Sequence, residues 1–270
     1  MKHYWVLLLA LSFGLVVRGQ KIEGLYDSTA PDLRNGCVDN ACFWTVEHLL
    51  TYYGVTLDKD GLRKGLQDSR PDVRSMAAEK LGNDGMKDAI PWLAAALSSE
   101  RIPGTRSYIG KALADLGDSR GFAVLEGMCR SSGEADVSVD AILRLRAASY
   151  IRDLHKNTCN AGVIDLLRSL DQPATPAGDL RTAALGTANV LQFLNEDQIA
   201  TVRGIAERWI SDEDESLRRQ AGRAIALYGD AASYERLKTA HDNERDATVR
   251  AAMEKQMRLT QARLRGTATP

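Results

Sequence analysis

Few prolines, phenylalanines, histidines and cysteines occur in this chain of 270 residues, and its charges nearly cancel. With only seven prolines, long stretches of helix can run without interruption. A net charge of −1 leaves no basic excess, so composition argues against a nucleic-acid-binding protein. The chain has instead much alanine, leucine and arginine, which favour helix. Its 44% of hydrophobic residues is an ordinary globular composition.

Familiar catalytic motifs are missing as well. The sequence contains no Gly-x-Ser-x-Gly elbow, no Gly-rich phosphate loop and no His-Glu-x-x-His zinc motif. His48, His155 and His241 stand far apart, and the cysteine spacings match no pattern of zinc ligands. We therefore expect no metal and no cofactor, and we assign no catalytic residue.

The first twenty residues are typical of a secretory signal peptide. Met1-Lys2-His3 is a short cationic region, and the apolar run from Tyr4 to Val17 follows it. A membrane span needs about 20 apolar residues, so this shorter run favours a cleaved signal over a retained anchor. We expect cleavage near Gly19 and Gln20, a periplasmic or secreted protein, and no stable membrane span afterwards.

Export permits disulfides, and the chain has four cysteines. Four cysteines allow three pairings. Neighbour pairing, Cys37 with Cys42 and Cys129 with Cys159, closes short loops, so we expect it before the other two pairings.

A pair of helices recurs along most of the chain. Residues 71–82 form the clearest first helix, with apolar side chains on one face, and residues 88–97 form the second helix after a turn at 83–85. An aliphatic or small residue followed by arginine marks each first helix, and the marking arginines are Arg74, Arg106, Arg146, Arg181, Arg218 and Arg250. One such pair cannot bury its own apolar face, so we expect the units to stack.

The repeat also divides the chain. We expect a signal peptide over residues 1–19, an extended segment over 20–39, a helical array over 40–265 and a disordered tail over 266–270. The first mature helix is predicted over 41–53, with Asp39 or Asn40 as its cap. The last helix, 247–265, has no partner helix and suits the cap that an array needs at its open end.

The repeat resembles a HEAT repeat, in the variety shared with the HEAT-like repeats of bilin lyases. In residues 68–97, Asp-Ser-Arg-Pro-Asp-Val-Arg precedes Ala-Ala, Leu-Gly and Ala-Ile-Pro-Trp-Leu, and residues 116–125 and 214–230 match the same pattern. The resemblance implies an all-α fold, an α-solenoid (superhelix) of about six stacked helix pairs. It also implies a structural arginine–aspartate ladder, to which we assign Asp72, Arg74, Arg181, Arg218 and Arg250.

For function, this resemblance favours an exported scaffold or adaptor. We expect it to bind a protein or peptide partner on its concave surface, which we predict the second helices to line. One alternative is an enzyme or enzyme accessory of the HEAT-like lyase type that uses the groove for a small molecule. Bilin attachment is a cytoplasmic activity, which conflicts with the export signal. The other alternative is a purely structural envelope protein.

Trp92 is the candidate contact residue. It lies in the second helix of the clearest unit, at a position that usually faces solvent in this repeat. A large aromatic side chain there suits the anchor of a partner. The alternative is a tryptophan that lies flat across the neighbouring unit, and the sequence leaves both open.

Non-reducing mass spectrometry of the exported protein should detect no free thiol, because two disulfides would use all four cysteines. Alkylation before and after reduction counts the thiols. Four alkylated cysteines in the unreduced sample would contradict both disulfides.

Overall fold

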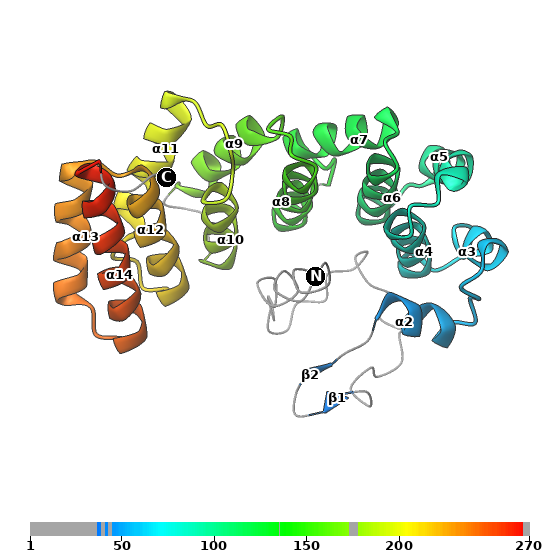
Figure 1. Cartoon of the computed structure of the whole chain (residues 1–270), viewed down its shortest axis with the longest axis horizontal. Helices are drawn as coiled ribbons and strands as arrows, with labels where there is room; N and C mark the ends of the chain where they lie inside the picture. Colours follow the sequence, from blue (N-terminus) through cyan, green and yellow to red (C-terminus); the bar gives the residue numbers. More distant parts are fainter. Residues whose placement is uncertain (1–36, 39–40, 43–44, 135, 173–177, 267–270) are drawn as a thin grey trace.

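The structure is a computed structural model that describes residues 37–38, 41–42, 45–134, 136–172 and 178–266. In this part of the chain, helices form a two-layer array that curves into an arch (Figure 1). The fold is an all-α solenoid, as predicted. Within the same residues, strand appears only in β1 (Cys37–Val38) and β2 (Ala41–Cys42), which pair antiparallel.

Six helix pairs and one final helix make up the described array. The first layer contains the first helix of each pair and the final helix: α2 (Val46–Tyr52), α4 (Pro71–Asn83), α6 (Pro103–Asp115), α8 (Val137–Asp153), α10 (Gly178–Ala188), α12 (Glu215–Tyr228) and α14 (Ala247–Leu264). The second layer contains the second helices: α3 (Lys59–Gly65), α5 (Ile90–Ser99) after the 3-10 turn η2 (Lys87–Ala89), α7 (Ser119–Arg130), α9 (Asn160–Leu170), α11 (Glu196–Trp209) and α13 (Ala231–Asn243). None of the described helices is both long enough and apolar enough to cross a membrane.

Local sequence explains where these helices begin. Asp136, Asp214 and Asp246 each accept two backbone N–H groups in the first turn of α8, α12 and α14. Pro71 and Pro103 stand at the start of α4 and α6, where the missing N–H of proline has no helical partner to lose. The starts of these five helices therefore follow from aspartate caps and first-turn prolines in the sequence.

The first helix is shorter than predicted. It begins at Val46 rather than at residue 41, because Ala41 and Cys42 pair with β1. Thr45 is the N-cap, and its hydroxyl accepts the His48 N–H at 3.3 Å.

Several predictions concern residues outside the described part. Asp39 and Asn40, the predicted caps, lie there. So do residues 1–36, with the predicted signal peptide and most of the predicted extended segment, and residues 267–270 of the predicted tail. These assignments stay predictions.

The core lies between the two layers. The fully buried Leu81, Leu93 and Leu113 of α4, α5 and α6 belong to one cluster, and the fully buried Leu125 of α7 belongs to a second cluster that continues to α14. The partly buried Val124 of α7 packs against both clusters. Because each cluster draws on several neighbouring pairs, each unit depends on the next for burial of its apolar face.

In two units, an arginine–glutamate pair connects the loop before the first helix to the loop after the second helix. Arg74 in α4 donates Nε to Glu100 Oε2 at 2.7 Å and Nη2 to Oε1 at 3.1 Å. Arg218 in α12 repeats this geometry with Glu244 at 2.6 and 3.0 Å. The third nitrogen of each arginine, Nη1, donates to two carbonyls of the loop before its own helix. Each arginine therefore bridges two junctions.

The other predicted ladder residues behave differently from one another. Arg181 Nη1 lies 3.4 Å from Asp212 Oδ2, and Arg250 Nη1 donates to the Glu244 carbonyl at 3.1 Å. Asp72 is not a ladder residue, because its Oδ1 is buried without a hydrogen-bond partner among the described residues. In the two closest pairs the arginine binds a glutamate, Glu100 or Glu244, and not an aspartate. Each glutamate follows the second helix of a unit and faces the arginine of the same unit.

In α8 the repeat arginine is Arg144 rather than Arg146. Arg144 donates to the carbonyls of Cys129 in α7 and Gly162 in α9 at 3.1 and 2.8 Å. Four other repeat arginines also donate to backbone carbonyls: Arg74, Arg106, Arg218 and Arg250. With this correction the repeat arginines are 32, 38, 37, 37 and 32 residues apart. The error arose because two consecutive Leu-Arg dipeptides, at 143–144 and 145–146, both fit the pattern.

The cysteines lie where neighbour pairing places them. The structure pairs Cys129, at the end of α7, with Cys159, just before α9, and their Cα atoms are 5.4 Å apart. Cys37 and Cys42 are directly opposite each other in the β1–β2 ladder. The oxidation state of all four thiols stays a prediction that the thiol count tests.

Replacing Arg74 by glutamine should lower the free energy of unfolding by about 3 to 5 kcal/mol, because a buried charge would lose its partner. The Glu100 side chain is only 5% exposed. Urea titration followed by circular dichroism measures the loss. Arg101→Gln is the matched control, because Arg101 is exposed and adjacent to Glu100, and it should change stability by less than about 0.5 kcal/mol.

The same pair predicts a pH dependence. Burial acts to raise the pKa of Glu100, but the Arg74 guanidinium and two backbone N–H groups outweigh it and hold the pKa below its ordinary value. The stabilisation is thus fully present above about pH 4.3, the ordinary glutamate pKa, and is lost as the pH falls through the lower folded-state pKa. The stability difference between wild type and Arg74→Gln should therefore shrink in acid. A difference that stays constant from pH 7 to pH 3 would contradict this assignment.

Candidate binding surface on the inner side of the arch

The first helices lie on the inner side of the arch and the second helices on its outer side (Figure 1). The prediction that second helices line the concave surface is therefore wrong. First helices approach closely: a Cβ added to Gly82 of α4 would come within 2.8 Å of the Ala112 Cα in α6. On the outer side, α11 and α13 leave a groove between them. Although α7 and α9 also touch, the first helices lie closer to one another along most of the array than the second helices do, and this closer layer is on the inside of the curve.

Tyr108 and Lys111 of α6 point to this inner side. α6 contacts α7 through Gly110 and Leu113, which lie against Gly121. At about 100° per residue, Tyr108 is about 200° from Gly110, and Lys111 is about 200° from Leu113. Because α7 lies on the outer side of α6 (Figure 1), both side chains face inward.

Side chains from α4, α6 and α8 meet there in what we call the inner-face cluster: Glu79, Tyr108, Lys111, Arg146 and Tyr150. The rings of Tyr108 and Tyr150 are 6.2 Å apart, centre to centre. The Arg146 guanidinium lies 5.3 Å from the centre of the Tyr108 ring, and the Lys111 ammonium lies 5.7 Å from that of Tyr150. Two cation–aromatic contacts thus join α6 to α8.

The charges of the cluster are only partly neutralised. Lys111 Nζ pairs with Asp115 Oδ1 at 2.5 Å. Arg146 and Glu79, both half-buried, make no hydrogen bond or ion pair with any described residue. Burial raises the pKa of Glu79, and the positive charge of Lys111 opposes that rise. The cluster therefore presents one basic and one acidic group whose hydrogen-bonding atoms have no partner among the described residues.

Tyr150 remains a neutral phenol in this environment. Burial raises its pKa well above the ordinary value, and the neighbouring Tyr108 adds to the rise, while Arg146 opposes it. A neutral phenol both donates and accepts a hydrogen bond. Tyr150 therefore adds a polar hydroxyl to an otherwise aromatic wall.

Sequence reasoning missed this cluster, although a signal for it exists. With Arg144 as the repeat arginine of α8, Met76, Tyr108 and Arg146 each stand two residues after a repeat arginine. They therefore occupy one row on the inner side of consecutive first helices. Assigning the repeat position to Arg146 itself concealed that row.

Trp92 lies in the outer layer, on α5, half-buried against the core. The Arg63 guanidinium of α3 is 5.2 Å from the centre of its ring. The side chain thus packs against the preceding unit, which is the second of the two alternatives for this residue. A role for Trp92 in binding stays a prediction.

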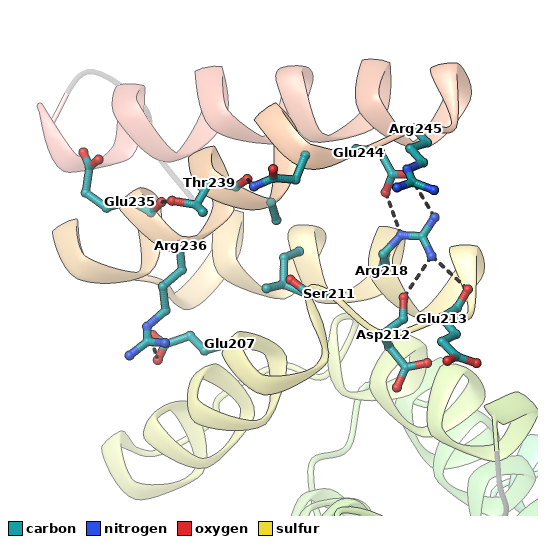
Figure 2. Close-up of a pocket in the computed structure, with 13 residues that line it drawn as sticks. Glu207, Ser211, Asp212, Glu213, Arg218, Glu235, Arg236, Thr239, Glu244 and Arg245 are labelled. Carbon is teal, nitrogen blue, oxygen red and sulfur yellow. Dashed lines mark hydrogen bonds and ion pairs between the residues drawn. The ribbon is translucent and has the colours of Figure 1, made fainter.

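The groove on the outer side has a volume of about 800 Å³. Figure 2 shows that ion pairs lie at both ends of its polar lining. Arg236 pairs with Glu207 at 3.5 Å between α13 and α11, and the ladder residue Arg218 pairs with Glu244 at 2.6 Å. The first pair connects neighbouring units and the second lies within one unit, so we assign both a structural role and take the inner-face cluster as the candidate site.

No metal site forms within the part of the chain that the structure describes, where no three His, Cys, Asp or Glu side chains come together. His48 lies in α2, His155 follows α8 and His241 lies in α13. The three histidines belong to different units and do not share a site.

One comparison with known proteins, that with family models, agrees with this architecture. Residues 60–146 match the family model of HEAT repeats. The crystal structure of an engineered protein from the Northeast Structural Genomics Consortium is 14% identical, with a TM-score of 0.46 over 77% of this chain and 96% of that one. No curated protein matches the sequence. Residues 60–146 of this all-α solenoid are therefore similar to HEAT repeats.

Proposed function

We propose that the chain is a HEAT-repeat scaffold that binds a protein or peptide partner on the inner side of its arch. The observation that supports this proposal is the inner-face cluster, which places two tyrosines and an arginine on the concave surface. Tyrosine and arginine are enriched among the residues that contribute most to binding at protein interfaces. The concave surface of a solenoid also suits an extended partner, because it runs along several repeats.

We propose further that the scaffold acts in the periplasm or outside the cell, after cleavage near Gly19 and Gln20. The support is the sequence of residues 1–19, with its cationic start and short apolar run. The paired positions of Cys129 and Cys159 fit an oxidising compartment, where disulfides persist.

A photo-crosslinking amino acid placed on the inner side should capture a partner in the native cell. Asp115 is the position to replace, because it is exposed at the end of α6 beside the cluster. Ala123, exposed on α7 in the outer layer, is the matched control. We expect discrete protein adducts after irradiation from position 115 and not from position 123, with the attachment sites mapped by mass spectrometry.

Adducts from position 123 alone, or from neither position, would contradict binding on the inner side. Circular dichroism of both variants checks that each one keeps its helical fold.

A further inference from the structure

Arg146 and Glu79 are the two charged groups of the inner-face cluster that no described residue neutralises by direct contact. Other arginines of α8 are occupied: Arg144 donates to two carbonyls and Arg152 to Asp153. Arg146 instead lies over the Tyr108 ring, and its N–H groups donate to no residue that the structure describes. A guanidinium has five N–H donors and no acceptor, so it is suited to a ligand that carries acceptor oxygens.

The stacking on Tyr108 also orients Arg146. A guanidinium held over an aromatic ring keeps its planar fork in a defined direction, so less freedom is lost when a carboxylate binds. Arg–carboxylate pairs are frequently bidentate, which adds geometric selectivity. An acidic side chain of a partner is the group that fits this fork.

Glu79 requires the opposite charge. Its carboxylate is half-buried, accepts no hydrogen bond from a described residue, and is close enough to Lys111 and Arg146 to feel both positive charges. Lys111 is already paired with Asp115. A lysine or arginine of the partner would supply the missing donor and offset the cost of burying the carboxylate.

A nucleic-acid backbone fits this surface poorly. Glu79 and Asp115 would repel a continuous row of phosphates, and the chain as a whole carries a net charge of −1. By contrast, a ligand with one acidic and one basic group matches the surface, because the acidic group can pair with Arg146 and the basic group with Glu79.

We propose that the inner-face cluster binds a mixed-charge segment of a protein partner, with an acidic side chain on Arg146 and a basic side chain on Glu79. This inference rests on the proposed function as a scaffold. Tyr108 and Tyr150 supply the aromatic surface between the two charges, and the segment lies across α4, α6 and α8.

The test uses immobilised decapeptides of Gly, Ser and Tyr that carry one Glu and one Lys, in both orders and one to five residues apart. Companion sets carry Glu alone, Lys alone or neither. We expect the folded protein to prefer mixed-charge peptides. Arg146→Gln should weaken them about threefold to tenfold and abolish the advantage of Glu, and Glu79→Gln should abolish the advantage of Lys.

Arg101→Gln and Glu235→Gln are the matched controls, because both side chains are exposed on other parts of the surface. They should bind the peptides as wild type does, and all four variants should show the circular dichroism of the wild type. Equal retention of charged and uncharged peptides would overturn the proposal, and so would binding unchanged in Arg146→Gln and Glu79→Gln.

A further experiment with a polyanion distinguishes a mixed-charge site from a site that binds any anion. If heparin binds the wild type and Arg146→Gln removes that binding, the cluster is a site for anions in general. The ligand then needs no basic group, and the mixed-charge segment is overturned. If crosslinks form at position 115 while the peptides show no charge preference, the partner chemistry is wrong and the scaffold stands. If no crosslink forms there, the scaffold itself fails.

Discussion

The buried pair of arginine and glutamate sets how one unit joins the next. Arg74 is held by carbonyls of the loop before α4 and reaches Glu100 in the loop after α5. The Glu100 carboxylate also accepts hydrogen bonds from the N–H groups of Arg101 and Ile102. The backbone carbonyl of Glu100 accepts a hydrogen bond from the Arg106 side chain in the next unit. Apolar burial is not directional, whereas these charge-assisted hydrogen bonds are. The core therefore holds the units together, and the ladder fixes their relative orientation.

The middle of the array uses a different junction. Arg144 donates to the carbonyls of Cys129 and Gly162, so it contacts the backbone of two neighbouring second helices. A Cβ at position 162 would come within 2.2 Å of the Cys129 carbonyl oxygen, so this approach of α9 to α7 requires glycine. Cys129 and Cys159 are paired at the same place. Close backbone contact thus takes the role that a carboxylate has for Arg74 and Arg218.

The fold was predictable because each first helix repeats the same packing demands. Small residues such as Ala77 and Gly82 must face the neighbouring helices, and an arginine must precede them, so one sequence pattern marks the array. The direction of the curve depends on the relative spacing of the two layers, and the sequence of a single repeat does not contain this information. The prediction that the second helices line the concave surface was therefore wrong. The start of α2 depends on strand pairing over two residues, which is too short to leave a sequence pattern.

The candidate site was harder to predict for a related reason. Packing constrains which residue types can occupy the core face and the position of the repeat arginine. It places no such constraint on the inner row, where Met76, Tyr108 and Arg146 have chemically different side chains. Only the correct register lines them up. Ala147 and Ala148 fall four and five residues after Leu143, as Ala77 and Ala78 do after Val73, and that spacing distinguishes the two registers.

Helix α8 carries both a structural arginine and an arginine of the candidate site. Arg144 and Arg146 are two residues apart and therefore about 200° apart around the helix. Arg144 fastens the outer side of α8 to the backbone of α7 and α9, and Arg146 extends over Tyr108 on the inner side. The contacts that hold α8 in place thus also hold the guanidinium at its ring, before any partner arrives. Such preorganisation lowers the entropic cost of binding. Helix α8 therefore has the close contact of α7 with α9 on its outer side and the inner-face cluster on its inner side.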